Sequence, residues 1–124
     1  MKVLLALAFT AALGTEAAFA DCVYPAAPDK IPDGATATLE EMLAGQKTVK
    51  AYQQAINDYT ACIDKELDEK IAKAGDKLKP EQKTDMERIE AQKHNAAVDQ
   101  AQSVADRFNE QVKVFKAKTA DKKG

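Results

Sequence analysis

His94 is the residue with the clearest capacity for chemistry, and it is the only histidine in the chain. Glu90 precedes it by four residues, a spacing that puts two side chains on one face of a helix. Imidazole and carboxylate groups bind Zn²⁺ or Cu²⁺ when one or two further ligands join them. No second ligand cluster is recognisable, so His94 and Glu90 are weak metal candidates and no cofactor is predicted. The competing interpretation is a half-buried imidazole that hydrogen-bonds Tyr59 or Asn95.

The two cysteines, Cys22 and Cys62, predict one disulfide bond. An even cysteine count in an exported protein is typical of a structural disulfide. A redox-active pair is disfavoured, because the two residues lack Cys-x-x-Cys spacing and neither has an obvious activating base beside it. A bond between two chains is the remaining alternative.

The sequence contains no recognised catalytic motif. Nucleophile-elbow, zinc-protease, phosphate-loop and haem-attachment patterns are all missing. Tyr24, Tyr52 and Tyr59 offer a ligand slot, but tyrosines on an apolar helical stripe are more typical of a core. A net charge of −2 gives no indication of a nucleic-acid partner. The prediction is a protein that is not an enzyme.

Residues 1–20 have the order of parts found in a cleaved export signal. A lysine at position 2 precedes an apolar stretch of eleven residues, and Ala-Phe-Ala follows at residues 18–20. The apolar stretch would rise about 16 Å as a helix, too little for a hydrocarbon core about 30 Å thick. We therefore expect a mature protein that starts near Asp21, is periplasmic or secreted, and has no transmembrane segment.

The remaining chain predicts an all-α fold built on a long antiparallel helical hairpin. Residues 21–37 hold three of the four prolines and form an extended arm. Thr38 and Glu41 form a capping box that starts a helix over 38–75, which Gly75 ends. Pro80 suits the first position of a second helix over 80–118, with Thr84 as a rival start. A basic tail is expected at 119–124.

A short connection makes the two helices antiparallel neighbours, packed along a coiled-coil-like seam. Folding the chain at residues 76–79 pairs Leu39 with Phe115, Gly45 with Phe108, Tyr52 with Ala101 and Tyr59 with His94. A glycine in a helix costs about 1 kcal/mol, and room for Phe108 explains the presence of Gly45. The apolar stripe of the second helix includes Ile89.

Small side chains flank this seam on the first helix, at Ala44, Thr48, Ala51, Ala55 and Cys62. From Thr38 to Cys62 the helix rises about 36 Å, and the arm can span about 50 Å in polyproline form. The arm can therefore run back along the first helix and be tied at Cys62. Its residues Val23, Tyr24, Pro25, Ile31 and Pro32 would then shield the seam. The alternative is a homodimer in which two hairpins bury the seam as a four-helix bundle.

Several short runs are shared with known exported proteins. They are CVYPAAP at 22–28, PDGATAT at 32–38, the spaced residues from Glu41 to Cys62, NAAVD at 95–99 and RFN at 107–109. On these runs the chain is similar to a group of small exported proteobacterial proteins. The resemblance implies a periplasmic location and supplies no catalytic residues, because the group has no assigned activity. A looser likeness to lysozyme-inhibitor proteins lacks their cysteine spacing and their aromatic–arginine signature.

These patterns together indicate a non-enzymatic binding or structural protein whose partner is unknown. A metal-binding protein centred on His94 is the second hypothesis. A chaperone-like or inhibitory helical protein is the third, and the chaperone version needs an exposed apolar patch.

Overall fold

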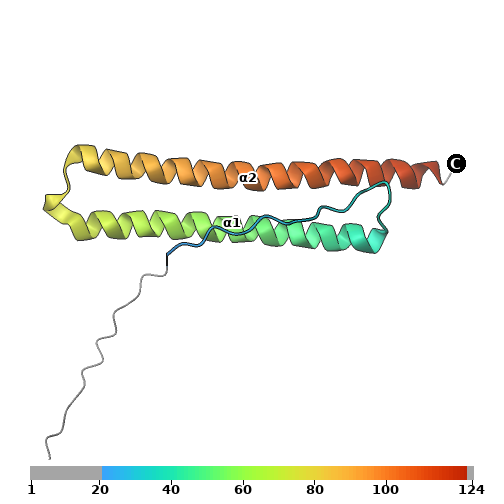
Figure 1. Cartoon of the computed structure of the whole chain (residues 1–124), viewed down its shortest axis with the longest axis horizontal. Coiled ribbons are helices and arrows are strands. Elements are labelled where there is room, and N and C mark those ends of the chain that lie inside the picture. The colour runs from blue at the N-terminus through green and yellow to red at the C-terminus, as the bar shows by residue number, and fades with distance from the viewer. Residues whose placement is uncertain (1–20, 123–124) are drawn as a thin grey trace, which may run out of the picture.

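The computed structural model describes residues 21–122, which form an extended arm and a hairpin of two long helices (Figure 1). Helix α1 spans Leu39–Ala74 and helix α2 spans Pro80–Asp121, with the short 3-10 helix η1 (Gly75–Lys77) between them. The predicted all-α hairpin is confirmed. The predicted export signal at 1–20 lies outside the described residues. Neither long helix has an apolar stretch of the length that a membrane span requires.

Both ends of α1 follow the local chemistry of the sequence. At its start, the Thr38 hydroxyl accepts a hydrogen bond from the Glu41 amide (3.2 Å), and the Glu41 carboxylate accepts one from the Thr38 amide (2.8 Å). At its end, Gly75 has a φ of 51°, a conformation that glycine adopts without steric cost. The Gly75 amide donates to the carbonyl of Ile71, so the last turn is closed.

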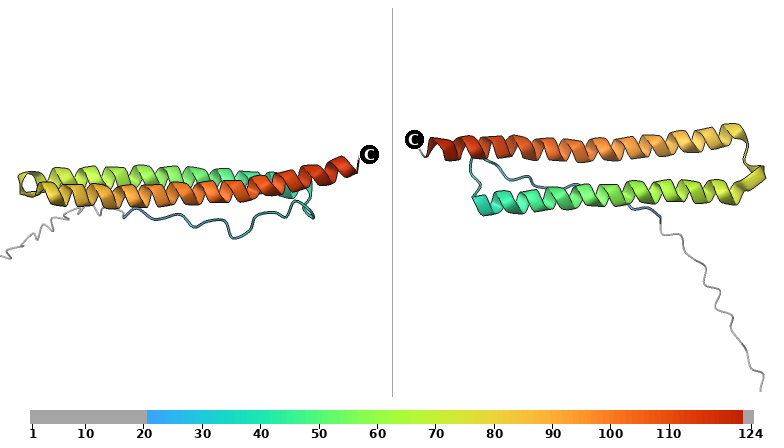
Figure 2. Two further views of the ribbon diagram at one scale, coloured as in Figure 1. Left: turned by 90° about the horizontal axis from the view of Figure 1, so that it is seen from above. Right: turned by 180° about the vertical axis from the view of Figure 1, so that it is seen from behind.

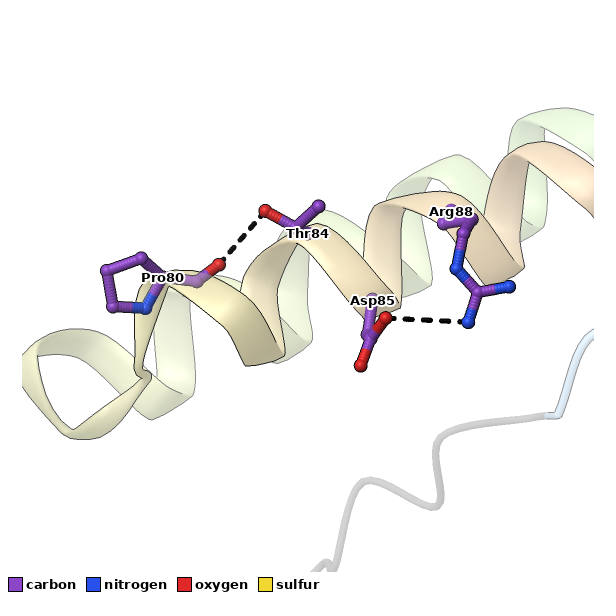
Figure 3. Close-up of polar contacts among 4 residues, drawn as sticks. All are labelled: Pro80, Thr84, Asp85 and Arg88. Atoms are coloured by element: carbon purple, nitrogen blue, oxygen red, sulfur yellow. Dashed lines mark hydrogen bonds and ion pairs between the residues drawn. The ribbon is translucent and has the colours of Figure 1, made fainter.

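Helix α2 begins at Pro80, and the rival start at Thr84 is wrong. The Thr84 hydroxyl donates to the carbonyl of Pro80 (3.0 Å), which is a bond made inside a helix rather than at a cap (Figure 3). One turn further on, Arg88 pairs with Asp85 at 3.4 Å (Figure 3). The first turn is instead closed by Gln82, whose side-chain oxygen accepts the Lys79 amide (3.0 Å).

The second helix also ends later than the predicted residue 118. Residues 119–121 are helical, and the Thr119 hydroxyl bonds back to the carbonyl of Phe115 (3.1 Å). The reason is that the sequence has no proline or glycine between Pro80 and Gly124, so nothing stops the helix where the lysines begin. The expected tail is thus shorter than 119–124.

The core lies in the half of the hairpin where α1 begins and α2 ends. Ile56 and Val104 are almost fully buried there, and Tyr52 is 4 % exposed. Two members of the predicted apolar stripes are exposed, Leu39 and Ile89. At Leu39 the seam is closed by Ala37, which belongs to the arm and is itself buried. Ile89 lies on the wall of a groove that the arm does not reach.

The arm lies along one side of the helix pair (Figure 2) and is tied to α1 by the Cys22–Cys62 disulfide, with the two Cα atoms 5.8 Å apart. Tyr24 packs edge to face on Tyr59, with ring centroids 5.1 Å apart. The prediction that the arm runs back along the first helix and is bonded at Cys62 is confirmed.

Val23 does not shield the seam as predicted, because its side chain is 82 % exposed. Successive side chains of an extended segment point to opposite sides. Cys22 and Tyr24 face the hairpin, so Val23 between them faces away from it. Further along the arm, Ala27 and Ile31 pack against the core.

The arm also binds α2, a contact that the sequence analysis missed. The Gly34 amide donates to the side-chain oxygen of Gln111 (2.9 Å), and Lys118 Nζ donates to the carbonyl of Ala37 (2.8 Å). A Cβ at Gly34 would collide with the backbone of Gln111, so only glycine fits this close approach. The arm therefore bridges both helices at the open end of the hairpin.

Candidate metal centre

Three potential metal ligands converge on the hairpin. Asp64 comes from α1, and Glu90 and His94 come from α2. His94 Nδ1 lies 3.6 Å from Asp64 Oδ1 and 3.8 Å from Glu90 Oε1. One ligand atom from each residue lies within 4.8 Å of the other two. The spacing of Glu90 and His94 predicted their shared face, and the structure adds the third ligand.

The sequence analysis missed Asp64 because it paired His94 with Tyr59. Side chains on a helix lean toward the helix N-terminus, and the N-terminus of α2 is at the hairpin turn. His94 therefore leans toward the turn and meets Asp64. Tyr59 contacts the arm through Tyr24 instead. This lean places Asp64, rather than Tyr59, within reach of His94.

Glu90 is the most buried member of the trio. Its side chain is 18 % exposed, whereas those of Asp64 and His94 are 53 % and 39 % exposed. Glu90 Oε1 is buried and has no hydrogen-bond partner among residues 21–122. The adjacent Asp64 carboxyl group, which competes for the same proton, raises the pKa of Glu90, and burial acts in the same direction. Without a cation, two neighbouring carboxylates thus favour a shared proton.

Two of the three separations between ligand atoms are close to those around a bound ion. Metal–ligand bonds of about 2.1 Å in a tetrahedral site put the ligand atoms about 3.4 Å apart. The two measured separations, 3.6 and 3.8 Å, need only a small contraction to reach that value. One imidazole nitrogen and two carboxylate oxygens suit Zn²⁺ or Cu²⁺ and leave a position for water.

Glu90→Gln should raise the free energy of unfolding of the metal-free protein by about 1 kcal/mol at pH 7, because the amide stays neutral and can donate to Asp64. The raised pKa of Glu90 means that its contribution to stability is complete in acid and is lost as the pH rises through the folded-state pKa. The benefit should therefore vanish below about pH 4. Urea unfolding with a chelator present, at pH 7 and in acid, measures the gain in stability and its pH dependence. A loss of stability at pH 7 would mean that the folded protein needs the Glu90 charge.

The other sequence candidates belong to the core rather than to a ligand site. Gly45 is buried against Phe108, which is itself buried. Tyr59 packs against this core. Tyr52 is buried, and burial raises the pKa of its phenol, with Tyr24 adding to the shift. Tyr52 and Tyr59 thus belong to the core, whereas Tyr24 stays 47 % exposed where it packs on Tyr59.

The fold and this trio define a disulfide-stapled helical hairpin with a candidate metal centre. No protein-family model, curated protein or solved structure matches the chain.

Proposed function

We propose that the protein is a non-enzymatic metal-binding protein of an oxidising compartment such as the periplasm. The observation that carries the proposal is the convergence of Asp64, Glu90 and His94 from two helices, with one buried carboxylate oxygen that lacks a hydrogen-bond partner. A divalent cation would satisfy that oxygen and remove the repulsion between the two carboxylates. Without a cation, that oxygen stays without a hydrogen-bond partner and the two carboxylates continue to repel each other.

The disulfide and the N-terminal sequence support the proposed location. Disulfide bonds persist in secreted and periplasmic proteins and are rare in the cytosol. The disulfide is present in the fold, and the pattern of residues 1–20 is that of an export signal.

The donor set favours Cu²⁺ over Zn²⁺ in affinity. Divalent metals bind a nitrogen and oxygen site in the order that ends with Cu²⁺ above Zn²⁺, and the harder Mg²⁺ and Ca²⁺ prefer oxygen ligands alone. The role of the protein's own groups is to hold the ion: α2 supplies two ligands one turn apart, and α1 supplies the third across the seam. The site is partly exposed, so an ion can enter and leave.

Isothermal titration of the purified protein with Zn²⁺ and with Cu²⁺ tests the proposal. We expect one ion per chain for each metal, and Cu²⁺ should bind more tightly. His94→Ala or Asp64→Asn should weaken binding at least tenfold, which corresponds to about 1.4 kcal/mol. Asp99→Asn is the matched control, because Asp99 is an exposed carboxylate on α2 outside the trio, and it should leave the affinity unchanged.

If neither metal binds, the trio is instead a structural cluster of charged side chains. In that case His94→Ala would lower the melting temperature of the metal-free protein.

A further inference from the structure

The side of the hairpin that carries the arm continues as an open groove beyond the disulfide. It is lined by four apolar side chains, Ile63, Leu67, Met86 and Ile89, and by four charged ones, Glu66, Lys70, Glu90 and Lys93. The groove has a volume of about 200 Å³. The described arm begins at residue 21, one residue before the disulfide, so this part of the seam has no cover from it (Figure 1). We call it the distal groove.

The distal groove lies on the same face as the arm, as the helical spacing shows. On α1, Cys62 bonds the arm, and Glu66 follows it by four residues and lines the groove. On α2, Gln111 holds the arm, and Lys93 precedes it by 18 residues, which is five full turns. The arm and the distal groove therefore occupy one continuous track along the hairpin.

The occupied part of this track shows what the track binds. An extended chain lies in it, with Ala27 and Ile31 packed against the core. Its main chain is held by side chains of α2: Gln111 accepts from the amide of Gly34, and Lys118 donates to the carbonyl of Ala37. This is recognition of an extended peptide by apolar contact together with main-chain hydrogen bonds.

The distal groove offers the same kinds of contact that hold the arm, namely apolar side chains and a lysine. Lys93 precedes Lys118 by 25 residues, about seven turns, and so occupies the equivalent position on the helix. Ile63 and Leu67 continue the apolar wall that receives the arm. From Ile63 to Lys70 the helix rises about 10 Å, a length that about three residues of extended chain cover.

We propose that the distal groove binds a short extended apolar segment of another polypeptide, placed in line with the arm. Apolar side chains of that segment fill the space between Ile63, Leu67 and Ile89, and Lys93 Nζ donates to one of its main-chain carbonyls. Glu90 lines the groove as well as belonging to the trio, but none of the four residues that contact the segment is a trio member, so separate variants test peptide binding and metal binding.

The probe is a synthetic peptide with the sequence of residues 23–32, which is the part of the arm that begins after its cysteine. Titrated into the ¹⁵N-labelled oxidised protein, it should shift the amide signals of Leu67, Met86 and Lys93 at millimolar concentration. Ile89→Asp should abolish these shifts. Val98→Asp is the matched control, because Val98 is as exposed as Ile89 (46 % against 45 %) and lies outside the groove.

A second pair of variants tests the main-chain contact. Lys93→Ala should weaken peptide binding about tenfold, and Lys93→Arg should restore it, because arginine keeps a donor at that position. A merely structural lysine would change the melting temperature and leave the peptide titration unaltered.

Three outcomes would overturn the proposal. The first is an absence of shifts at millimolar peptide. The second is shifts confined to residues around Gly45 and Phe108, because the peptide would then compete with the arm for the arm's own site. The third is a dimer of the peptide-free protein that Ile89→Asp dissociates, because the groove would then be covered by a second copy of the chain.

Discussion

Replacing Cys22 and Cys62 together by serine should lower the free energy of unfolding by about 4 kcal/mol. The disulfide closes a loop with a sequence separation of 40, and the entropy of the unfolded chain that it removes corresponds to that value. This loss should be a large fraction of the total free energy of unfolding, because small domains have only about 5–15 kcal/mol of stability. Urea unfolding followed by circular dichroism measures it.

The reduced wild-type protein is the control for this variant. If the covalent link alone is responsible, reduction by a dithiol and the double substitution should produce the same unfolding curve. A change below about 1 kcal/mol in both would contradict the prediction, and it would mean that the contacts of Gly34, Ala37 and Pro32 hold the arm without the bond.

Gly45→Leu should lower the free energy of unfolding by about 2 kcal/mol and the melting temperature by roughly 10 °C. A Cβ at this position would lie 2.5 Å from Cγ of Pro32 and 3.0 Å from Cε2 of Phe108. The gain in helix propensity of about 1 kcal/mol offsets part of that cost. The arm or the Phe108 ring has to move, and thermal unfolding measures the result.

Ala51→Leu is the matched control for Gly45→Leu, because Ala51 lies on the same helix and is exposed. Its effect should stay within about 0.5 kcal/mol. Hydrogen exchange of the Gly34 amide gives a second readout, since displacing Pro32 loosens the arm that Gln111 holds. An unchanged melting curve of Gly45→Leu would contradict both the register and the docking of the arm.

The helices were predictable because their signals are local. The capping box of Thr38, the positive φ of Gly75 and the first-turn position of Pro80 each act within a few residues, and the structure places the helix boundaries beside them. The end of α2 was misjudged because lysines only favour a helix end, whereas a glycine or proline imposes it.

Two of the three candidate metal ligands were predicted from the sequence. Glu90 and His94 share a helix, so their spacing of four was enough to place them on one face. Asp64 is 30 residues away in the sequence, and its identity as the third ligand depends on how two side chains lean across the seam. Asp64 follows Tyr59 on α1 by five residues, which is about 1.4 helical turns.

The sequence by itself determined the helical class, the antiparallel pairing and the disulfide. Those depend on periodicity, on caps and on a count of two cysteines, and each is a property of neighbouring residues or of composition. Only the tertiary structure decided that the arm bridges to Gln111 and Lys118, that Asp64 completes the trio and that the distal groove is open. The physical reason is that these features depend on distances between segments far apart in the chain, and such distances are set by packing.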